Sequence, residues 1–297
     1  MFYRDFMEYH QDRFEDHSLM VYRSDELIGV IPANIKHGIA YSHQGLTYGG
    51  LVVSLKANFK DTLESYQAII KYLNTRGIRF LKLKRIPRIY ENLPSDAIDY
   101  CLFKSKAERD RCDLTMAIDL KSTAVEMSTN RKRNLKKAQA HNIKVREVFE
   151  FDSFFKQVLI PNLKERHQTS PTHTAAELDL LRSHFPDHIR QFNAYYEDEI
   201  IAGVTVFVTN RVAHAQYIST LDSMRHLGGL DMIFDHLIQT TFKEKWYFNF
   251  GISNENQGQQ INEGLLHWKS SFGAHPIVHE FYTITTENYK LLNDVWI

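Results

Sequence analysis

The residues best suited to chemistry stand between Tyr217 and Gly229. A strand that ends at Thr220 would present backbone N–H groups near Tyr217 and Ser219, and such groups can stabilise a developing oxyanion. Asp222 follows directly and could accept a proton, although a solvated turn carboxylate is the alternative. No convincing Ser-His-Asp or Cys-His arrangement is present, so a side-chain nucleophile is not expected.

An anion site is predicted immediately after this strand. Gly228 and Gly229 open a helix, and the first N–H groups of a helix are unpaired at the positive end of its dipole. Glycines let a ligand approach the backbone closely, and Arg225 in the same loop could pair with a phosphate. The alternative is a plain helix cap beside an exposed arginine.

Five further polar residues are candidates for contacts with the substrate. Lys269 could steer a phosphate or a carboxylate, or it could be a surface lysine with a packed apolar stem. Asn249 and Asn254 flank a turn and could hydrogen-bond an amide-like substrate, or simply shape the turn. His43 and Tyr48 lie in a glycine-rich loop and could face a cleft between the halves of the chain, although a satisfied loop histidine is the alternative.

Composition excludes several other classes of function. The two cysteines and fifteen histidines show none of the spacings that hold zinc, so no metal site is expected. The 36 basic and 36 acidic residues cancel, and the net charge therefore favours neither nucleic acid nor an anionic membrane. We expect a soluble, cytoplasmic protein, because the N-terminal segment lacks the apolar core of a signal peptide and no apolar run could cross a bilayer.

The segment that must position these residues is predicted as strand, loop, helix and strand. Arg211–Thr220 alternates in polarity, Gly228–Lys245 repeats apolar residues at helical spacing, and Trp246–Phe250 is a short aromatic strand. Thr174 and Glu177 predict a capping box at the start of another helix. Further helices are expected over Phe2–Phe14, Asp61–Arg76, Thr123–His141, Phe151–Arg166, Thr174–Phe185, Gly258–Phe272 and Glu287–Val295, and a strand over Tyr100–Lys104.

The same order of elements occurs twice along the chain. Tyr22–Val30 resembles Tyr196–Val204 when one residue of slip is allowed in the turn. Each is followed by an asparagine, a third strand, a polar loop, a long helix and another strand. Agreement over about five consecutive elements indicates an internal duplication. We therefore expect two domains, residues 1–121 and residues 122–297.

Three local motifs add to this order of elements. They are Arg133–Ala138 (RNLKKA), Tyr247–Gly251 (YFNFG) and Gly264–Gly273 (GLLHWKSSFG). They are similar to the RxNxxKA helix, the aromatic strand that ends in glycine, and the GLxxFKxxFG motif of the FemAB/FemX family of peptidoglycan bridge-forming aminoacyltransferases. The order of elements in each half also resembles that of the GNAT acyltransferases, so the resemblance spans nearly the whole chain.

The resemblance implies an α/β (α+β) chain of two tandem GNAT-like domains, each a mixed, mostly antiparallel sheet flanked by helices. It also implies acyl transfer from acetyl-CoA or another acyl-CoA to a primary amine, with the donor bound by residues 122–297. In that reaction the backbone near Tyr217 and Ser219 would face the acyl carbonyl, and Asp222 could accept the proton of the amine. The pyrophosphate-binding pattern of GNAT proteins is kept at Arg225 and Gly228, whereas Leu230 stands where glycine or alanine is usual. The long coiled-coil arm of some tRNA-dependent members has no counterpart.

Two alternatives stay open. The first is FemX-like transfer of an amino acid from aminoacyl-tRNA to a peptidoglycan precursor, for which the basic segment Arg131–Lys137 could hold a phosphate backbone or could form a solvated face. The second is a non-catalytic binding protein with a GNAT fold. The sequence predicts neither the amine acceptor, nor the acyl group, nor the oligomeric state.

Overall fold

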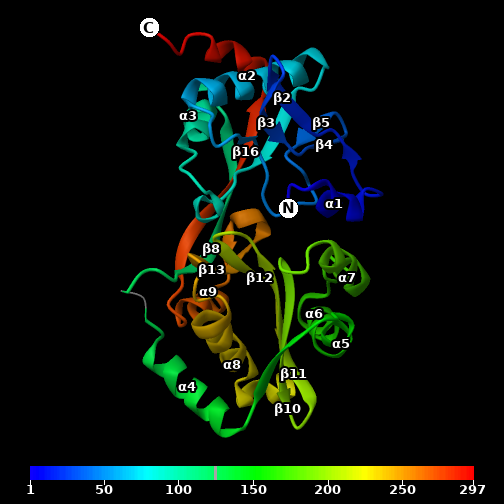
Figure 1. Ribbon diagram of the computed structural model, residues 1–297, viewed down its shortest axis with the longest axis vertical. Helices are drawn as coiled ribbons and strands as arrows, with labels where there is room; N and C mark the ends of the chain where they lie inside the picture. Colours follow the sequence, from blue (N-terminus) through cyan, green and yellow to red (C-terminus); the bar gives the residue numbers. More distant parts are fainter. Residues whose placement is uncertain (124–125) are drawn as a thin grey trace. The chain divides into compact units, whose positions relative to one another are not determined.

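The computed structural model describes residues 1–123 and 126–297, and the chain forms two compact units (Figure 1). The first contains residues 1–113, 256–260 and 278–297, and the second contains residues 114–255 and 261–277. Neither unit is continuous in sequence, because the end of the chain returns to the first. A boundary at residues 121 and 122 between two duplicated halves stays a prediction.

The first unit is built on strands in the order β1-β4-β5-β7-β16. β7 is parallel to β5 and antiparallel to β16. A separate small sheet has the order β2-β3-β6. The strands are β1 (Glu15–Asp16), β2 (Leu19–Arg23), β3 (Glu26–Ile31), β4 (Asn34–Lys36), β5 (Ile39–Tyr41), β6 (Val52–Val53), β7 (Phe80–Lys84) and β16 (His275–Thr285), and the helices are α1 (Arg4–Met7), η1 (Glu8–His10), α2 (Phe59–Thr75), η2 (Arg88–Tyr90), α3 (Asp96–Lys104), η6 (Asn256–Gly258) and η7 (Thr286–Leu292).

Helix α2 supplies one side of the core of this unit. It begins at a capping box in which the side chain of Asn58 accepts the backbone N–H of Asp61 at 3.0 Å and the Asp61 carboxylate accepts that of Asn58 at 3.0 Å. Its buried apolar residues recur at helical spacing, as the sequence predicts. Gly77, with φ of +77°, follows its last turn and stops the helix.

Several predicted elements differ from the structure. The helix predicted over Phe2–Phe14 is only α1 and η1, residues 4–10. The strand predicted over Tyr100–Lys104 is wrong: these residues end helix α3, in which Ile98, Cys101 and Leu102 are buried at a spacing of three and four. The long helix predicted from Gly258 is only α9 (Glu263–Ser270), because residues 256–258 all have positive φ and lie between the short strands β14 (Asn254–Glu255) and β15 (Gln260–Ile261). The closing helix is the 3₁₀ segment η7.

The second unit is a six-stranded sheet in the order β8-β13-β12-β11-β10-β9. β9, β10, β11 and β12 are antiparallel neighbours, β12 and β13 are parallel, and β8 is antiparallel to β13. The strands are β8 (Glu108–Asp119), β9 (Lys144–Val148), β10 (Ile189–Tyr196), β11 (Glu199–Val208), β12 (Val212–Thr220) and β13 (Tyr247–Ile252), and the helices are α4 (Thr129–Ala140), α5 (Asp152–Phe154), η3 (Phe155–Leu159), α6 (Ile160–His167), α7 (Ala175–His184), η4 (Asp222–Leu227), α8 (Gly229–His236), η5 (Leu237–Thr241) and α9.

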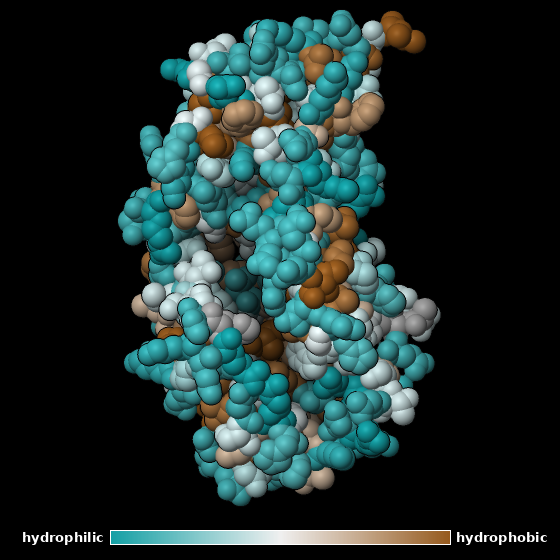
Figure 2. All heavy atoms as spheres, turned by 180° about the vertical axis from the view of Figure 1, so that it is seen from behind, coloured by the Kyte–Doolittle hydropathy of each residue, from teal (hydrophilic) through white to brown (hydrophobic). Residues whose placement is uncertain are grey.

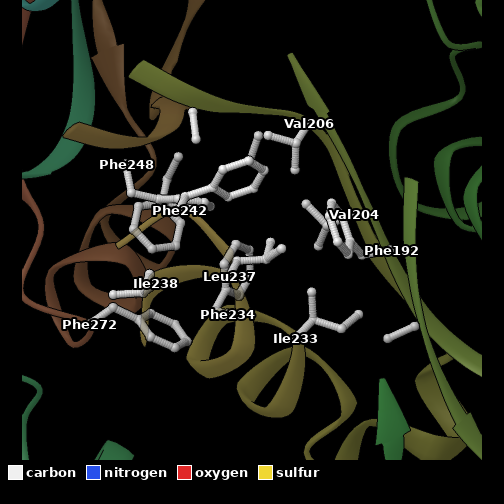
Figure 3. Packing of buried hydrophobic residues seen from close by; sticks show 14 of the residues in the cluster. Phe192, Val204, Val206, Ile233, Phe234, Leu237, Ile238, Phe242, Phe248 and Phe272 are labelled. Atoms are coloured by element: carbon white, nitrogen blue, oxygen red, sulfur yellow. The ribbon is translucent and has the colours of Figure 1, made fainter. Parts of the chain in front are cut away.

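Helices cover both faces of this sheet (Figure 1). On one face, α8 and η5 pack their apolar side chains against Phe192, Val204 and Val206 of the sheet (Figure 3). On the other face lies the continuous helical run of α5, η3 and α6. Its middle widens into a π-helix just before Pro161, whose ring nitrogen has no N–H to donate. The capping box of Thr174 and Glu177 starts α7, as predicted.

Helix α4 is shorter than the predicted Thr123–His141, of which residues 124 and 125 lie outside the described part of the chain. One arginine, whose side chain is 12% exposed, holds it in place. Nη1 of Arg131 lies 2.6 Å from Oδ1 of Asp231 in α8, and Nε and Nη2 donate to Oγ of Ser271 at 3.1 and 3.0 Å. The guanidinium also lies 4.4 Å from the ring centre of Phe272. Four other basic residues of α4 are exposed: Lys132, Arg133, Lys136 and Lys137.

Within the described residues, no helix has the length and apolar character needed to span a membrane. Hydrophilic side chains predominate on the face drawn in Figure 2, and hydrophobic ones are scattered among them.

Replacement of Arg131 by methionine is expected to lower the free energy of unfolding by about 3 kcal/mol, because it leaves the carboxylate of Asp231 buried without its partner. Urea unfolding of the wild type and the variant measures this difference. Lys136→Met, on the exposed face of the same helix, is the control and should change stability by less than about 0.5 kcal/mol. Equal losses from both substitutions would mean that the ion pair does not anchor α4.

Candidate functional site

The neighbouring strands β12 and β13 are paired over a short distance only. Val212–His214 lies in register with Tyr247–Asn249. Beyond these residues, β12 continues to Thr220 along β11, and β13 continues to Ile252 along β8. The two strands therefore part, and the later half of β12 turns backbone groups towards the gap instead of towards a paired strand.

A β-bulge lies where β12 leaves its partner. Thr205 of β11 is opposite Tyr217, but the next residue, Val206, is opposite Ala215. Gln216 is therefore the extra residue of the bulge. Bulges bend a strand and increase its twist, which gives a local cause for the parting of the two parallel strands.

The side chain of Tyr217 forms a pair with a histidine from the loop before α7. Its hydroxyl oxygen accepts the backbone N–H of His173 at 3.0 Å and lies 2.7 Å from Nδ1 of the same residue. The ring packs edge-on against Phe155 at 5.5 Å, and burial raises the pKa of the phenol. Sequence reasoning missed His173, because no local pattern relates it to a residue 44 positions away.

Ser219 points towards the helical run that covers β12. Its hydroxyl accepts a hydrogen bond from Nδ2 of Asn162 at 2.9 Å and donates to the carbonyl oxygen of Val158 at 3.4 Å. The side chain is buried and occupied by these contacts. Its predicted part in the chemistry is that of its backbone, and this stays a prediction.

The predicted proton acceptor and the predicted phosphate ligand contact each other. Nη2 of Arg225 lies 2.9 Å from Oδ1 of Asp222, and Arg166 of α6 makes a two-point ion pair with the same carboxylate, with Nε 3.0 Å from Oδ2. The hydrogen bonds from Arg166 are the main reason that the pKa of Asp222 is lowered. A carboxylate held in this way is a weak proton acceptor.

The two glycines at the start of α8 are also required by packing. Gly228 has φ of +77°, and a Cβ there would lie 2.8 Å from Cβ of Ala138 in α4. A Cβ on Gly229 would lie 3.0 Å from Cδ1 of Ile201. The helix cap and the predicted anion site are therefore compatible interpretations of the same residues.

Lys269 and Asn249 hold the turn at the end of β13. Nζ of Lys269 donates to the carbonyl oxygens of Gly251 and Ile252 at 3.0 and 2.6 Å, and the residue is 2% exposed. Oδ1 of Asn249 accepts from Oγ1 of Thr115 at 2.6 Å and from the N–H of Gly251 at 2.8 Å. Because these atoms bind the chain itself, a part in binding a substrate stays a prediction for both residues.

The remaining candidates lie further from the bulge in sequence. Oδ1 of Asn254 accepts the backbone N–H of Leu114 at 2.5 Å. His43 and Tyr48 belong to the first unit. His43 is buried against His10, with ring centres 5.2 Å apart, and burial lowers its pKa to about 4. Burial also raises the pKa of Tyr48.

In the described parts of the chain, no three His, Cys, Asp or Glu residues are grouped so that they could hold a metal ion. Six of the predicted site residues lie on strand β12 or in the segment after it: Tyr217, Ser219, Asp222, Arg225, Gly228 and Gly229.

The sequence matches the acetyltransferase (GNAT) domain family over residues 126–270. This match contains the bulge of β12, the loop after it and all of α8 and α9. A search of curated protein sequences found no match.

Three solved structures are similar in fold. FemX is 10% identical, with a TM-score of 0.65 over 97% of this chain and 93% of that one. The C-terminal domain of a putative lysylphosphatidylglycerol synthetase from Agrobacterium fabrum is 12% identical, with a TM-score of 0.62 over 98% and 90%. A tandem GNAT protein from the clavulanic acid biosynthesis pathway is 10% identical, with a TM-score of 0.52 over 95% and 87%. The chain therefore has the FemX-like tandem GNAT fold, and the match to the GNAT acetyltransferase domain family covers its residues 126–270.

Proposed function

We propose that this protein is an N-acyltransferase that moves an acyl group from an acyl-CoA, such as acetyl-CoA, to a primary amine at the end of β12. The observation that carries the proposal is the parting of β12 from β13 beside the bulge at Gln216. A gap between parallel strands gives a thioester carbonyl access to backbone N–H groups, which stabilise the oxyanion of the tetrahedral intermediate. The GNAT domain match supports the class of reaction.

The loop after β12 is suited to the diphosphate of coenzyme A. Arg166, Arg225 and Asp222 together leave one positive charge, since two guanidinium groups share one carboxylate. The start of α8 at Gly228 adds backbone N–H groups and the positive end of a helix dipole. Because two arginines hold Asp222 as a carboxylate, we assign it the orientation of Arg225 rather than the acceptance of a proton.

A second candidate is FemX-like transfer from aminoacyl-tRNA to a peptidoglycan precursor. The observation that favours it is the exposed basic face of α4, formed by Lys132, Arg133, Lys136 and Lys137. The similarity in fold to FemX is compatible with it. A non-catalytic binding protein is the third candidate, and it predicts that no acyl donor is consumed.

Arg225→Ala separates these candidates. Isothermal titration with acetyl-CoA, coenzyme A and charged tRNA is expected to show binding of the two coenzyme A compounds, weakened about tenfold by this substitution because a charged partner of phosphate is lost. Arg133→Ala, on the exposed face of α4, is the control and should leave that affinity unchanged. Binding of charged tRNA that Arg133→Ala weakens and Arg225→Ala does not would support the second candidate, and binding of no acyl donor would support the third.

Lys269, whose side chain holds the turn at the end of β13, is expected to make the stability of the protein depend on pH. Burial lowers the pKa of Lys269 from 10.5 to about 7, so between these values the unfolded chain keeps a proton that the folded chain has released. The free energy of unfolding contributed by Lys269 therefore rises as pH increases from about 7 to about 10.5. In Lys269→Met this part of the rise should vanish.

Urea unfolding at pH 7 and pH 10 measures the effect. Lys84, whose pKa burial lowers to about 8, contributes a smaller rise that remains in the variant. The exposed Lys136→Met serves as the matched control and should keep the full rise of the wild type. The same pH dependence in Lys269→Met and the wild type would show that Lys269 keeps an ordinary pKa.

A further inference from the structure

Two histidines of the first unit form a buried pair. His10 of η1 is 1% exposed, and His43, in the loop after β5, is 3% exposed. Their ring centres lie 5.2 Å apart, with the ring planes at 87°. Neither ring nitrogen of His10 has a hydrogen-bond partner among the described residues, whereas Nδ1 of His43 accepts the backbone N–H of Gly45 at 3.3 Å. Buried polar atoms without partners are rare in native proteins, so the place of His10 needs an explanation.

The surroundings of His10 are aromatic and closely packed. The centre of its ring lies 4.2 Å from that of Tyr9 and 5.1 Å from that of Phe14. The backbone of Gly45 is pressed against it, because an added Cβ at Gly45 would overlap the imidazole ring. A proton added to this imidazole would therefore be surrounded by rings and by a glycine.

The charges that face the two histidines are mostly positive or already paired. They belong to three basic and two acidic residues: Arg4, Arg13, Lys84, Asp12 and Asp16. The carboxylate of Asp16 lies 3.1 Å from Nη1 of Arg4 and accepts the hydroxyl of Ser18 at 2.6 Å, and that of Asp12 lies 3.7 Å from Nε of Arg13. Burial, more than any of these charges, lowers the pKa of both histidines from 6.5 to about 4.

The histidine pair joins the N-terminal segment, which is residues 1–14, to the loop of residues 42–50. Two further ring contacts cross the same boundary: Phe14 packs against His43 at 5.4 Å, and Phe2 packs against Tyr48 at 6.1 Å. Rings that pack in this way bind without fixing backbone hydrogen bonds. The attachment of the segment therefore depends on burial of its side chains, among which the imidazole of His10 is the one that can gain a charge.

The chain on either side of this boundary is held independently. From Glu15 on, strand β1 pairs with β4. In the loop, the carbonyl oxygen of Gln44 accepts Nζ of Lys84 at 3.0 Å, and its backbone N–H donates to Oδ1 of Asn34 at 2.8 Å. The N-terminal segment can therefore leave while the loop and the strands keep their hydrogen bonds.

We propose that His10 and His43 form an acid-sensitive latch, which holds the N-terminal segment on the loop of residues 42–50 at neutral pH and releases it in acid while the rest of the first unit stays folded. A protonated imidazole in this place would be a charge kept from water beside a second histidine, whereas release lets water solvate it. Release uncovers His43 and Tyr48. The latch lies in the first unit and rests on no part of the proposed acyl transfer.

The direction of the pH dependence follows from the pKa values of the two states. The released histidines have the ordinary pKa of 6.5, and the docked ones have a pKa of about 4. Docking is therefore favoured above pH 6.5, and the equilibrium moves towards release as pH falls from 6.5 to 4. Between pH 7 and pH 5 each histidine shifts this equilibrium about 20-fold, and the pair shifts it about 400-fold.

Hydrogen exchange of the full chain at pH 7 and pH 5, with each rate divided by the intrinsic rate of that amide, tests the latch. The reporters are the amides of Phe6 and Met7, which both donate to the carbonyl oxygen of Tyr3 at 3.1 Å. A helix as short as α1 is not stable alone, so their protection reports docking. We expect it to fall about 400-fold at pH 5, or to that of a free peptide, while the amides of α2 and β7 stay protected.

Two substitutions remove the titrating groups. His43→Asn keeps a hydrogen-bond acceptor and suits the φ of +64° at this residue, and His10→Met has a similar volume. Each should reduce the shift about 20-fold, and the double variant should show almost none. His37→Asn is the matched control, because His37 also has a positive φ but is exposed, and it should keep the full shift.

A permanent charge tests the same contact without a change of pH. His10→Arg should leave Phe6 and Met7 unprotected at pH 7 while α2 and β7 keep their protection. Equal protection of the reporters at pH 7 and pH 5 in the wild type would overturn the latch, as would loss of protection in α2 and β7 together with the segment. If His10→Met releases the segment at both pH values, His43→Asn decides alone: a shift reduced to about 20-fold supports the latch, and an undiminished shift contradicts it.

Discussion

Two parallel strands stay paired only while both follow the same twist, and in the second unit β12 and β13 stop doing so after three residues. Each strand contributes a cause. In β12, the extra residue Gln216 bends the strand. In β13, the side chains of Lys269 and Asn249 hold the turn at Gly251, where φ is +77°. Hydrogen bonds inside the protein thus fix the place where the two strands part.

At the start of α8, close packing and the predicted anion site would both favour glycine. Gly228 accepts no side chain without strain, because its φ is +77° and Ala138 lies too close, and a Cβ on Gly229 would press on the side chain of Ile201. Asp231 places a carboxylate in the first turn of the helix, where it meets the positive end of the dipole, and Arg131 neutralises it. The glycines alone therefore say little about a ligand. The prediction of an anion site rests instead on the two arginines that both contact Asp222.

The sequence patterns that predict structure are local, and this sets which parts of the fold could be predicted. Local patterns predicted the strand–loop–helix–strand segment around α8 and the capping box of α7, because the periodic residues and the capping residues are close in sequence. They failed at α3, where the polar residues before Tyr100 hid the helical spacing of Ile98 and Cys101.

Partners distant in sequence could not be predicted in the same way. Asp222 was identified as reactive, yet its ion pair with Arg166 joins residues 56 positions apart. The pair of Tyr217 and His173 likewise depends on how the loop before α7 folds back. Strand pairing is subject to the same limit: residues 114–119 of β8 belong to the second unit and residues 278–285 of β16 belong to the first, an exchange that no local pattern encodes.

Each unit contains a pair of parallel neighbouring strands, and the two pairs can be compared. In the first unit this pair is β5 and β7. There the loop after β5 closes onto β7: the backbone N–H of Lys84 donates to Oγ of Ser42 at 2.8 Å, and its carbonyl oxygen accepts the N–H of Gly49 at 2.9 Å. Nζ of Lys84 then binds the carbonyl oxygens of Gln44 and Leu46 at 3.0 and 2.6 Å.

The region beside the parallel pair that stays unpaired in the second unit is therefore occupied by the protein's own chain in the first. The hydrogen bonds of that loop and the surface that it buries stabilise the first unit. This difference supports the proposal that an acyl donor binds in the second unit, and it leaves the loop of the first unit, with His43 and Tyr48, a part in holding its own strands together.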